Sequence, residues 1–194
     1  MILLHLAKKT NETLNPNAMH TTTSTIPADD LGRTLLYAQP DKSGSLPHIG
    51  LVGGTYTVTV SGRDTNGKFS VIDMHVPPGG GPPPHRHDFE ETFVLLEGEV
   101  EATFRGRKLT VKAGETINIP ANAPHRFLNV SKSPARMLCI CAPAGPETYF
   151  AELGVAVATR TTPPPALSAS EQAAFVEKVR MLAPKYSTEL LRDA

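Results

Sequence analysis

The chain has 194 residues, 40% of them hydrophobic, and its 19 Lys and Arg residues balance 19 Asp and Glu residues. Zero formal net charge excludes a nucleic-acid-binding protein that relies on a broad basic field, and also an acidic disordered chain. No apolar run approaches the roughly 20 residues that a membrane helix needs. The apolar start lacks the preceding basic residues of a secretory signal peptide. We therefore expect one soluble, cytoplasmic domain with additional terminal segments.

After its apolar start, the N-terminal region is polar. Residues 1–30 are rich in Thr, Asn and Asp, which predicts a flexible N-terminal arm. Nothing in residues 1–18 shows a regular period, so Met19 is a candidate for the natural start. Ordered structure is expected to begin near Leu31–Tyr37, and a barrel domain is predicted over residues 31–145.

A hairpin is the first regular feature. In residues 55–60, Thr alternates with Tyr or Val, which is the period-two pattern of a strand. Asn66-Gly67 predicts a hairpin turn, and residues 69–76 predict the returning strand. Ile72 and Met74 lie on its more apolar face, so we expect these two side chains to point inward.

Short strands of four to eight residues are predicted along the rest of the domain, separated mostly by Gly or Pro. These runs are 91–97, 99–105, 108–112, 116–119, 125–130 and 136–142. Regularly spaced short strands are typical of an all-β sandwich or barrel.

The character of the sequence changes after Pro143. Residues 146–153 predict a short helix with Pro at its start and Gly154 just past its end, and residues 161–165 form a Pro-rich linker. Ser168 and Glu171 form a capping box, which predicts a second helix that ends at Pro184. Its apolar stripe comprises Phe175, Val176, Val179 and Leu182. We expect this helical extension (146–194) to pack on the outer face of the barrel or on a partner subunit.

Two cysteines, Cys139 and Cys141, lie two residues apart on a predicted strand, so their side chains share one face. A disulfide between such close neighbours is strained. We interpret them as two small buried hydrophobic side chains; a redox or metal-binding role is the alternative.

Three histidines and a glutamate are the candidate functional residues. His85 and His87 share one face of a strand, Glu91 begins the next strand, and His125 begins a later one. If these side chains converge inside a barrel, they offer imidazole nitrogens and a carboxylate oxygen to a metal. Such a donor set suits one divalent transition metal: Fe, Mn, Ni, Co, Cu or Zn.

The spacing of these residues resembles the two motifs of the cupin superfamily. Gly79, His85, His87, Glu91 and Gly98 are separated by five, one, three and six residues, which resembles the first motif without a departure. The second motif comprises Gly114, Pro120, Asn122, His125 and Asn129, separated by five, one, two and three residues. Asn122 stands where the family usually has Gly; because Asn tolerates a left-handed backbone, we expect the turn to be kept.

The resemblance implies an all-β, double-stranded β-helix (jelly-roll) barrel with one metal held by His85, His87, Glu91 and His125. A single barrel with a Pro-Pro-Pro-His entry and a C-terminal helix is similar to quercetin 2,3-dioxygenase-like monocupins. By this resemblance, Glu91 also acts as the catalytic base that takes a proton from a substrate hydroxyl group. Apolar walls are expected to raise the pKa of Glu91.

Alternation of side chains places a set of apolar residues in the predicted substrate pocket, although core packing is the alternative for each. The set comprises Ile72, Met74, Phe93, Leu95 and Phe127. The leading hypothesis is a dioxygenase or related oxidoreductase acting on a small flavonol-like or enolisable substrate. The alternatives are another metal-dependent cupin enzyme (isomerase, decarboxylase or lyase) and a non-catalytic, metal-bound small-molecule sensor.

We expect the partners to be a small-molecule substrate and a second copy of the chain, with no nucleic acid and no membrane. The homodimer is expected because the N-terminal segment, the strand at Tyr56–Val60 and the amphipathic helix after Ser168 all need surfaces to cover them.

Overall fold

The computed structural model describes residues 26–42 and 44–192. Most of the predicted N-terminal arm, including the candidate start at Met19, lies outside the described residues. Contacts divide the chain into two units, residues 1–34 and residues 35–194. Residues 26–34 are exposed and contain no helix or strand. Every element of regular structure described below belongs to the second unit.

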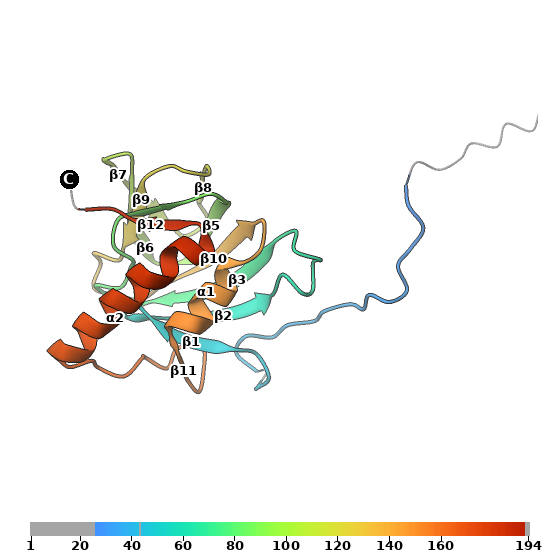
Figure 1. Ribbon diagram of the computed structural model, residues 1–194, viewed down its shortest axis with the longest axis horizontal. Coiled ribbons are helices and arrows are strands. Elements are labelled where there is room, and N and C mark those ends of the chain that lie inside the picture. Colours follow the sequence, from blue (N-terminus) through green and yellow to red (C-terminus); the bar gives the residue numbers. More distant parts are fainter. Residues whose placement is uncertain (1–25, 43, 193–194) are drawn as a thin grey trace, which may run out of the picture. The chain divides into compact units, whose positions relative to one another are not determined.

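The strands of the described residues form two antiparallel sheets (Figure 1). The seven-stranded sheet has the order β11 (Val155–Ala156), β1 (His48–Leu51), β2 (Gly54–Val60), β3 (Ser70–Val76), β10 (Ala135–Ala142), β5 (Glu90–Glu97), β8 (Thr116–Ile119). The five-stranded sheet has the order β12 (Thr188–Leu190), β4 (His85–His87), β9 (His125–Leu128), β6 (Glu99–Phe104), β7 (Arg107–Lys112). This is the predicted all-β barrel.

The predicted hairpin is confirmed: β2 pairs with β3, and Asn66 and Gly67 in the connecting loop both have positive φ. The inward face of β3 is also confirmed, since Ile72 and Met74 are buried. The opposite face of β3 is not fully exposed to solvent, however. Asp73 is buried there because the Arg136 guanidinium on β10 donates hydrogen bonds to both of its carboxylate oxygens.

Both predicted helices are present, as α1 (Pro146–Leu153) and α2 (Ala169–Leu182), and the capping box at Ser168 and Glu171 is formed. A 3₁₀ helix, η1 (Ala183–Tyr186), follows α2 directly. The last strand, β12, was not predicted, because three residues are too few to show a period. β12 pairs with β4, so the C-terminal extension completes the sheet that carries His85 and His87.

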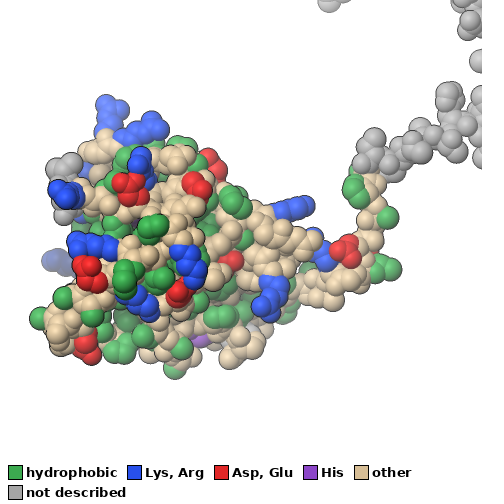
Figure 2. Space-filling model, in the orientation of Figure 1, with side chains coloured by type: hydrophobic (Ala, Val, Ile, Leu, Met, Phe, Trp, Pro, Cys, Tyr) green, Lys and Arg blue, Asp and Glu red, His purple; other side chains and the backbone are tan. Residues whose placement is uncertain are grey.

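Among the described residues, no helix is long and apolar enough to cross a membrane. The face shown in Figure 2 carries both basic and acidic side chains, interspersed with hydrophobic ones. This mixture agrees with the balanced formal charge of the chain.

Candidate metal centre

The four residues predicted from their spacing converge in the structure. His85 and His87 lie on β4, Glu91 on β5 and His125 on β9. Their ligand atoms all lie within 4.8 Å of one another. His87, Glu91 and His125 are buried, whereas His85 is partly exposed.

The local fold explains how β4 is held in place. β4 lies between β12 and β9, and His85 is directly opposite His125 in the antiparallel pair. Asn122 has φ 68°, so the predicted left-handed turn is confirmed, and its backbone N–H donates a hydrogen bond to the His87 carbonyl at 2.6 Å. At Gly81 a side chain is excluded, because a Cβ atom would lie 2.2 Å from the Phe127 carbonyl oxygen.

Each imidazole is oriented by a backbone carbonyl that accepts a hydrogen bond from its Nδ1 atom. The Nδ1 atoms of His85, His87 and His125 donate to the carbonyl oxygens of residues 83, 89 and 123, respectively, at 2.9, 3.0 and 2.9 Å. Since a carbonyl can only accept, these bonds assign the proton to Nδ1 and leave Nε2 as a bare acceptor in each neutral ring. Metal-ligating histidines are oriented in this way.

The Glu91 carboxylate then faces two of these bare nitrogens. Its Oε2 atom lies 3.3 Å from His87 Nε2 and 3.1 Å from His125 Nε2. An ionised carboxylate and a neutral Nε2 are both acceptors, so this arrangement needs a cation between them, either a proton or a metal. With His85 beside them, the donor set fits one divalent transition metal.

The surroundings shift the pKa values of these groups. Burial by itself raises the pKa of Glu91, but hydrogen bonds and charge interactions with His125 and His87 outweigh it and hold this pKa well below its ordinary value. The expected raised pKa was therefore wrong, because it considered the apolar walls and not the two rings. Burial, followed by repulsion from His125, lowers the pKa of His85 to about 4, which keeps this ring neutral near pH 7. The pKa of His125 is raised, since its interaction with Glu91 outweighs burial.

The neighbouring Glu90 is turned away from the centre. It is exposed, and its carboxylate accepts hydrogen bonds from Asn118 Nδ2 at 2.9 Å and from the backbone N–H of Ala121 at 3.1 Å. These bonds hold the pKa of Glu90 below its ordinary value. The alternation along β5 therefore places Glu91 alone of this pair in the cluster.

A cavity of about 1140 Å³ adjoins the cluster and includes His85, His87 and Glu91 in its lining. Phe89 stacks on His87 with the ring planes 3° apart and the ring centroids 3.6 Å apart. Most of the remaining wall is aromatic or aliphatic: Leu51, Val52, Tyr56, Met74, Phe127, Tyr149, Phe150, Leu153, Phe175, Val176 and Val179. The cavity therefore suits an apolar ligand of substantial size that carries a polar group toward the histidines.

Of the five predicted pocket residues, Met74 and Phe127 line the cavity. Ile72, Phe93 and Leu95 lie in the hydrophobic core instead. All five point inward, but alternation along a strand cannot separate side chains that fill the barrel from side chains that border its open part.

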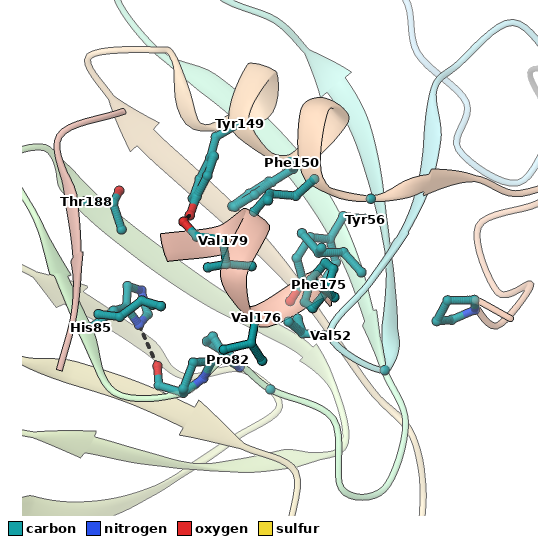
Figure 3. Close-up of a pocket in the computed structure, with 18 of the residues that line it drawn as sticks. Val52, Tyr56, Pro82, His85, Tyr149, Phe150, Phe175, Val176, Val179 and Thr188 are labelled. Carbon is teal, nitrogen blue, oxygen red and sulfur yellow. Dashed lines mark hydrogen bonds between the residues drawn. The ribbon is translucent and has the colours of Figure 1, made fainter. Parts of the chain in front are cut away.

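The residues that sequence reasoning missed come from the helical extension. Figure 3 shows Phe175, Val176 and Val179 of α2 on the same cavity as His85. The sequence predicts their apolar stripe, but on the outer face of the barrel or against a partner subunit. In the structure this stripe covers the cavity, and α2 is joined to α1 by a hydrogen bond from the Tyr149 hydroxyl to the Val179 carbonyl.

The two cysteines are fully buried and form no disulfide. Their sulfur atoms lie 3.5 Å apart, and Cys139 Sγ lies 3.2 Å from Glu91 Oε1. Burial raises the pKa of the Cys139 thiol well above its ordinary value. The prediction of two buried side chains on one strand face is confirmed, but the contact with Glu91 was not foreseen.

Comparisons with known proteins found partial similarities. An uncharacterized protein of Methanocaldococcus jannaschii is 36% identical over 39% of this chain and 62% of its own length. Quercetin 2,3-dioxygenase of Bacillus subtilis is 26% identical over 51% of this chain and 29% of its own length. The chain thus spans less than two thirds of either relative. The crystal structure of an RmlC-like cupin from Shewanella frigidimarina has a TM-score of 0.48 and 15% identity, covering 59% of this chain and 99% of that one.

Residues 72–141 match the family described as "Cupin domain". This range contains all four residues of the cluster and the strands from β4 to β9, together with most of β3 and β10. This part of the chain is therefore similar to a cupin domain, and its barrel has the double-stranded β-helix fold with a His and Glu cluster able to hold a metal.

Proposed function

We propose that this protein is a metal-dependent dioxygenase or related oxidoreductase that acts on a small flavonol-like or enolisable substrate. The observation that carries the proposal is the arrangement of acceptors at the centre. The Nδ1 atoms of the three histidines are all occupied by carbonyl oxygens, and the Nε2 atoms of His87 and His125 face the Glu91 carboxylate. That geometry supports a shared metal ion as the group between them.

The cavity supports the substrate class. Tyr56, Phe127, Tyr149, Phe150 and Phe175 offer aromatic surface to a planar ring system, and edge-to-face or stacked contacts with such rings add to the burial of apolar area. The volume of about 1140 Å³ is ample for a ligand of several fused or linked rings. The similarity to the B. subtilis quercetin 2,3-dioxygenase, over half of this chain, points the same way.

The residues of the chain supply binding, exclusion of water and a proton acceptor. A bound divalent metal would supply Lewis-acid stabilisation of negative charge and a template for the substrate. The pKa of Glu91 lies below its ordinary value, so its carboxylate is ionised near pH 7 and is available to accept a proton from a substrate hydroxyl group. Apolar side chains of α2 line the same cavity as this carboxylate, and their surface disfavours water there.

The proposal is tested by metal analysis and by oxygen uptake. Protein purified without a nickel column is stripped with a chelator and loaded separately with Fe, Mn, Ni, Co, Cu or Zn. We expect about one metal ion per chain, and oxygen consumption with members of a panel of flavonols and diketones. Less than about a tenth of a metal ion per chain after loading would overturn the metal site. Turnover without oxygen consumption would favour an isomerase, decarboxylase or lyase.

His87→Ala is the test variant and His75→Ala the matched control. His75 lies on β3 and is not one of the clustered donors. We expect His87→Ala to lose the metal while the barrel stays folded, because the strands carry the core, and His75→Ala to keep the metal. If circular dichroism shows that His87→Ala is grossly unfolded while His75→Ala is folded, the metal is structural.

A further inference from the structure

The strand β10 brings a thiol to the back of the Glu91 carboxylate. In the antiparallel pair of β10 and β5, Cys141 is directly opposite Glu91 and Cys139 is opposite Phe93. Cys139 is therefore the diagonal neighbour of Glu91 on the inward face. Its sulfur lies 3.2 Å from Glu91 Oε1, and both side chains are buried.

The two oxygens of this carboxylate have different surroundings. Oε2 faces the imidazoles of His87 and His125, whereas Oε1 faces the Cys139 thiol. An ionised carboxylate only accepts hydrogen bonds, so the thiol is the donor to Oε1. A thiol has a single proton, and Cys141 must then be the donor across the 3.5 Å separation of the two sulfur atoms. The order of donation is Cys141 to Cys139 to Glu91.

We propose that Cys139 is a positioning residue that orients Glu91, so that Oε2 is presented to the imidazole nitrogens. A buried carboxylate oxygen without a partner costs free energy, and the side chain would rotate to reduce that cost. The thiol removes this cost at Oε1 and favours the rotamer that aims Oε2 at the centre. This role rests on the proposed metal function, since the oriented oxygen is the one offered to the metal.

The test compares three variants of the same buried face. Cys139→Ala removes the donor, Cys139→Ser keeps a donor at the same place, and Cys141→Ala removes an equally buried sulfur that is not the donor to Glu91. Affinity for the metal that loads the wild type is measured by competition with a chromophoric chelator. Loss of a group that orients a ligand typically lowers metal affinity ~10–100-fold. We expect a loss of about tenfold or more in Cys139→Ala, and changes below about threefold in the other two variants.

A second measurement reads the hydrogen bond itself. In Cys141→Ala the Raman S–H stretching band belongs to Cys139 alone, because the chain has two cysteines. We expect this band at the lower frequency of a hydrogen-bonded thiol, and a shift upward when Glu91→Ala is added. An unshifted band, or equal metal affinity in Cys139→Ala and wild type, would overturn the role of Cys139. Equal losses in all three variants would also overturn it, because they would indicate packing. Failure of the wild type to bind any metal would instead overturn the proposed function.

Discussion

At the scale of single residues, we propose that Glu91 is both a metal ligand and a proton acceptor, two roles that one substitution can separate. Glu91→Gln keeps an oxygen that can ligate weakly, but an amide cannot accept a proton near pH 7. If Glu91 takes the substrate proton, we expect the variant to retain metal on its three histidines and to lose ~10²–10⁴-fold in turnover. Steady-state kinetics on protein with verified metal content is the measurement.

The control for this prediction is metal in excess. If the loss of turnover in Glu91→Gln disappears when more metal is added, Glu91 acts only as a metal ligand. Normal turnover of metal-replete Glu91→Gln would show that the chemistry does not need the carboxylate. Glu90→Gln is the matched variant, since Glu90 is exposed and bonded to Asn118 and Ala121; we expect it to keep both metal and turnover.

At the scale of elements, α2 is a wall of the cavity. Phe175 is partly buried against the core and lines the cavity, whereas Met181 on the same helix is 74% exposed. Truncating Phe175 removes apolar area worth about 1.5 kcal/mol or more in a buried contact. We therefore expect Phe175→Ala to raise the KM for an accepted flavonol about tenfold and Met181→Ala to leave it unchanged. An unchanged KM in Phe175→Ala would mean that α2 does not contact the substrate.

We expect the stability of the junction of α1, α2 and η1 to depend on pH through Glu152. Its carboxylate accepts hydrogen bonds from Lys185 Nζ at 2.7 Å and from the Tyr186 hydroxyl, and its backbone carbonyl accepts one from Lys178. The bonds from Lys185 and then Tyr186 hold the pKa of Glu152 below its ordinary value of 4.5. A lowered folded-state pKa means that the stabilisation is present above pH 4.5 and is lost as the pH falls through the folded-state value.

We predict that the difference in free energy of unfolding between wild type and Glu152→Gln is constant from pH 7 to about pH 5 and shrinks below pH 4.5. Urea unfolding at several pH values measures this difference. Glu177→Gln is the control, because Glu177 pairs with Arg180 on the exposed side of α2 and bonds to neither α1 nor η1 in the described hydrogen-bond network. The prediction is contradicted if the difference in free energy of unfolding between wild type and Glu152→Gln grows as the pH falls.

At the scale of the whole molecule, we propose a homodimer on different grounds from those in the sequence. β2, which contains Tyr56–Val60, lies inside its sheet between β1 and β3, and the stripe of α2 faces the cavity. Neither needs a partner to cover it. The feature that supports a homodimer is the apolar segment Leu35–Tyr37, in which the Leu35 side chain is 93% exposed and the Tyr37 side chain 77% exposed.

Light scattering at micromolar concentration is expected to give a mass near twice 20.8 kDa. Replacing Leu35 and Tyr37 together by Ser should shift the protein toward the monomer. Leu109→Ser, which alters an exposed residue on β7, should not. A wild-type mass near 20.8 kDa would contradict the homodimer.

The sequence by itself determined the barrel, its hairpin, both helices and the four clustered donors. These features depend on local rules: alternation along strands, capping at Ser168, a left-handed turn at Asn122 and the spacing of His85, His87, Glu91 and His125. Glu91 could be distinguished from Glu90 because alternate residues of a strand face opposite ways.

Only the tertiary structure decided which inward side chains border the cavity, because Ile72 and Met74 have the same pattern yet only Met74 lines it. It also decided that α2 covers the cavity and that β12 completes the sheet beside β4, since both depend on where a distant part of the chain returns. The lowered pKa of Glu91 and the hydrogen bond that Glu91 accepts from Cys139 also depend on the tertiary structure. They arise between residues on separate strands, whose distances and directions are set by packing and not by spacing along the chain.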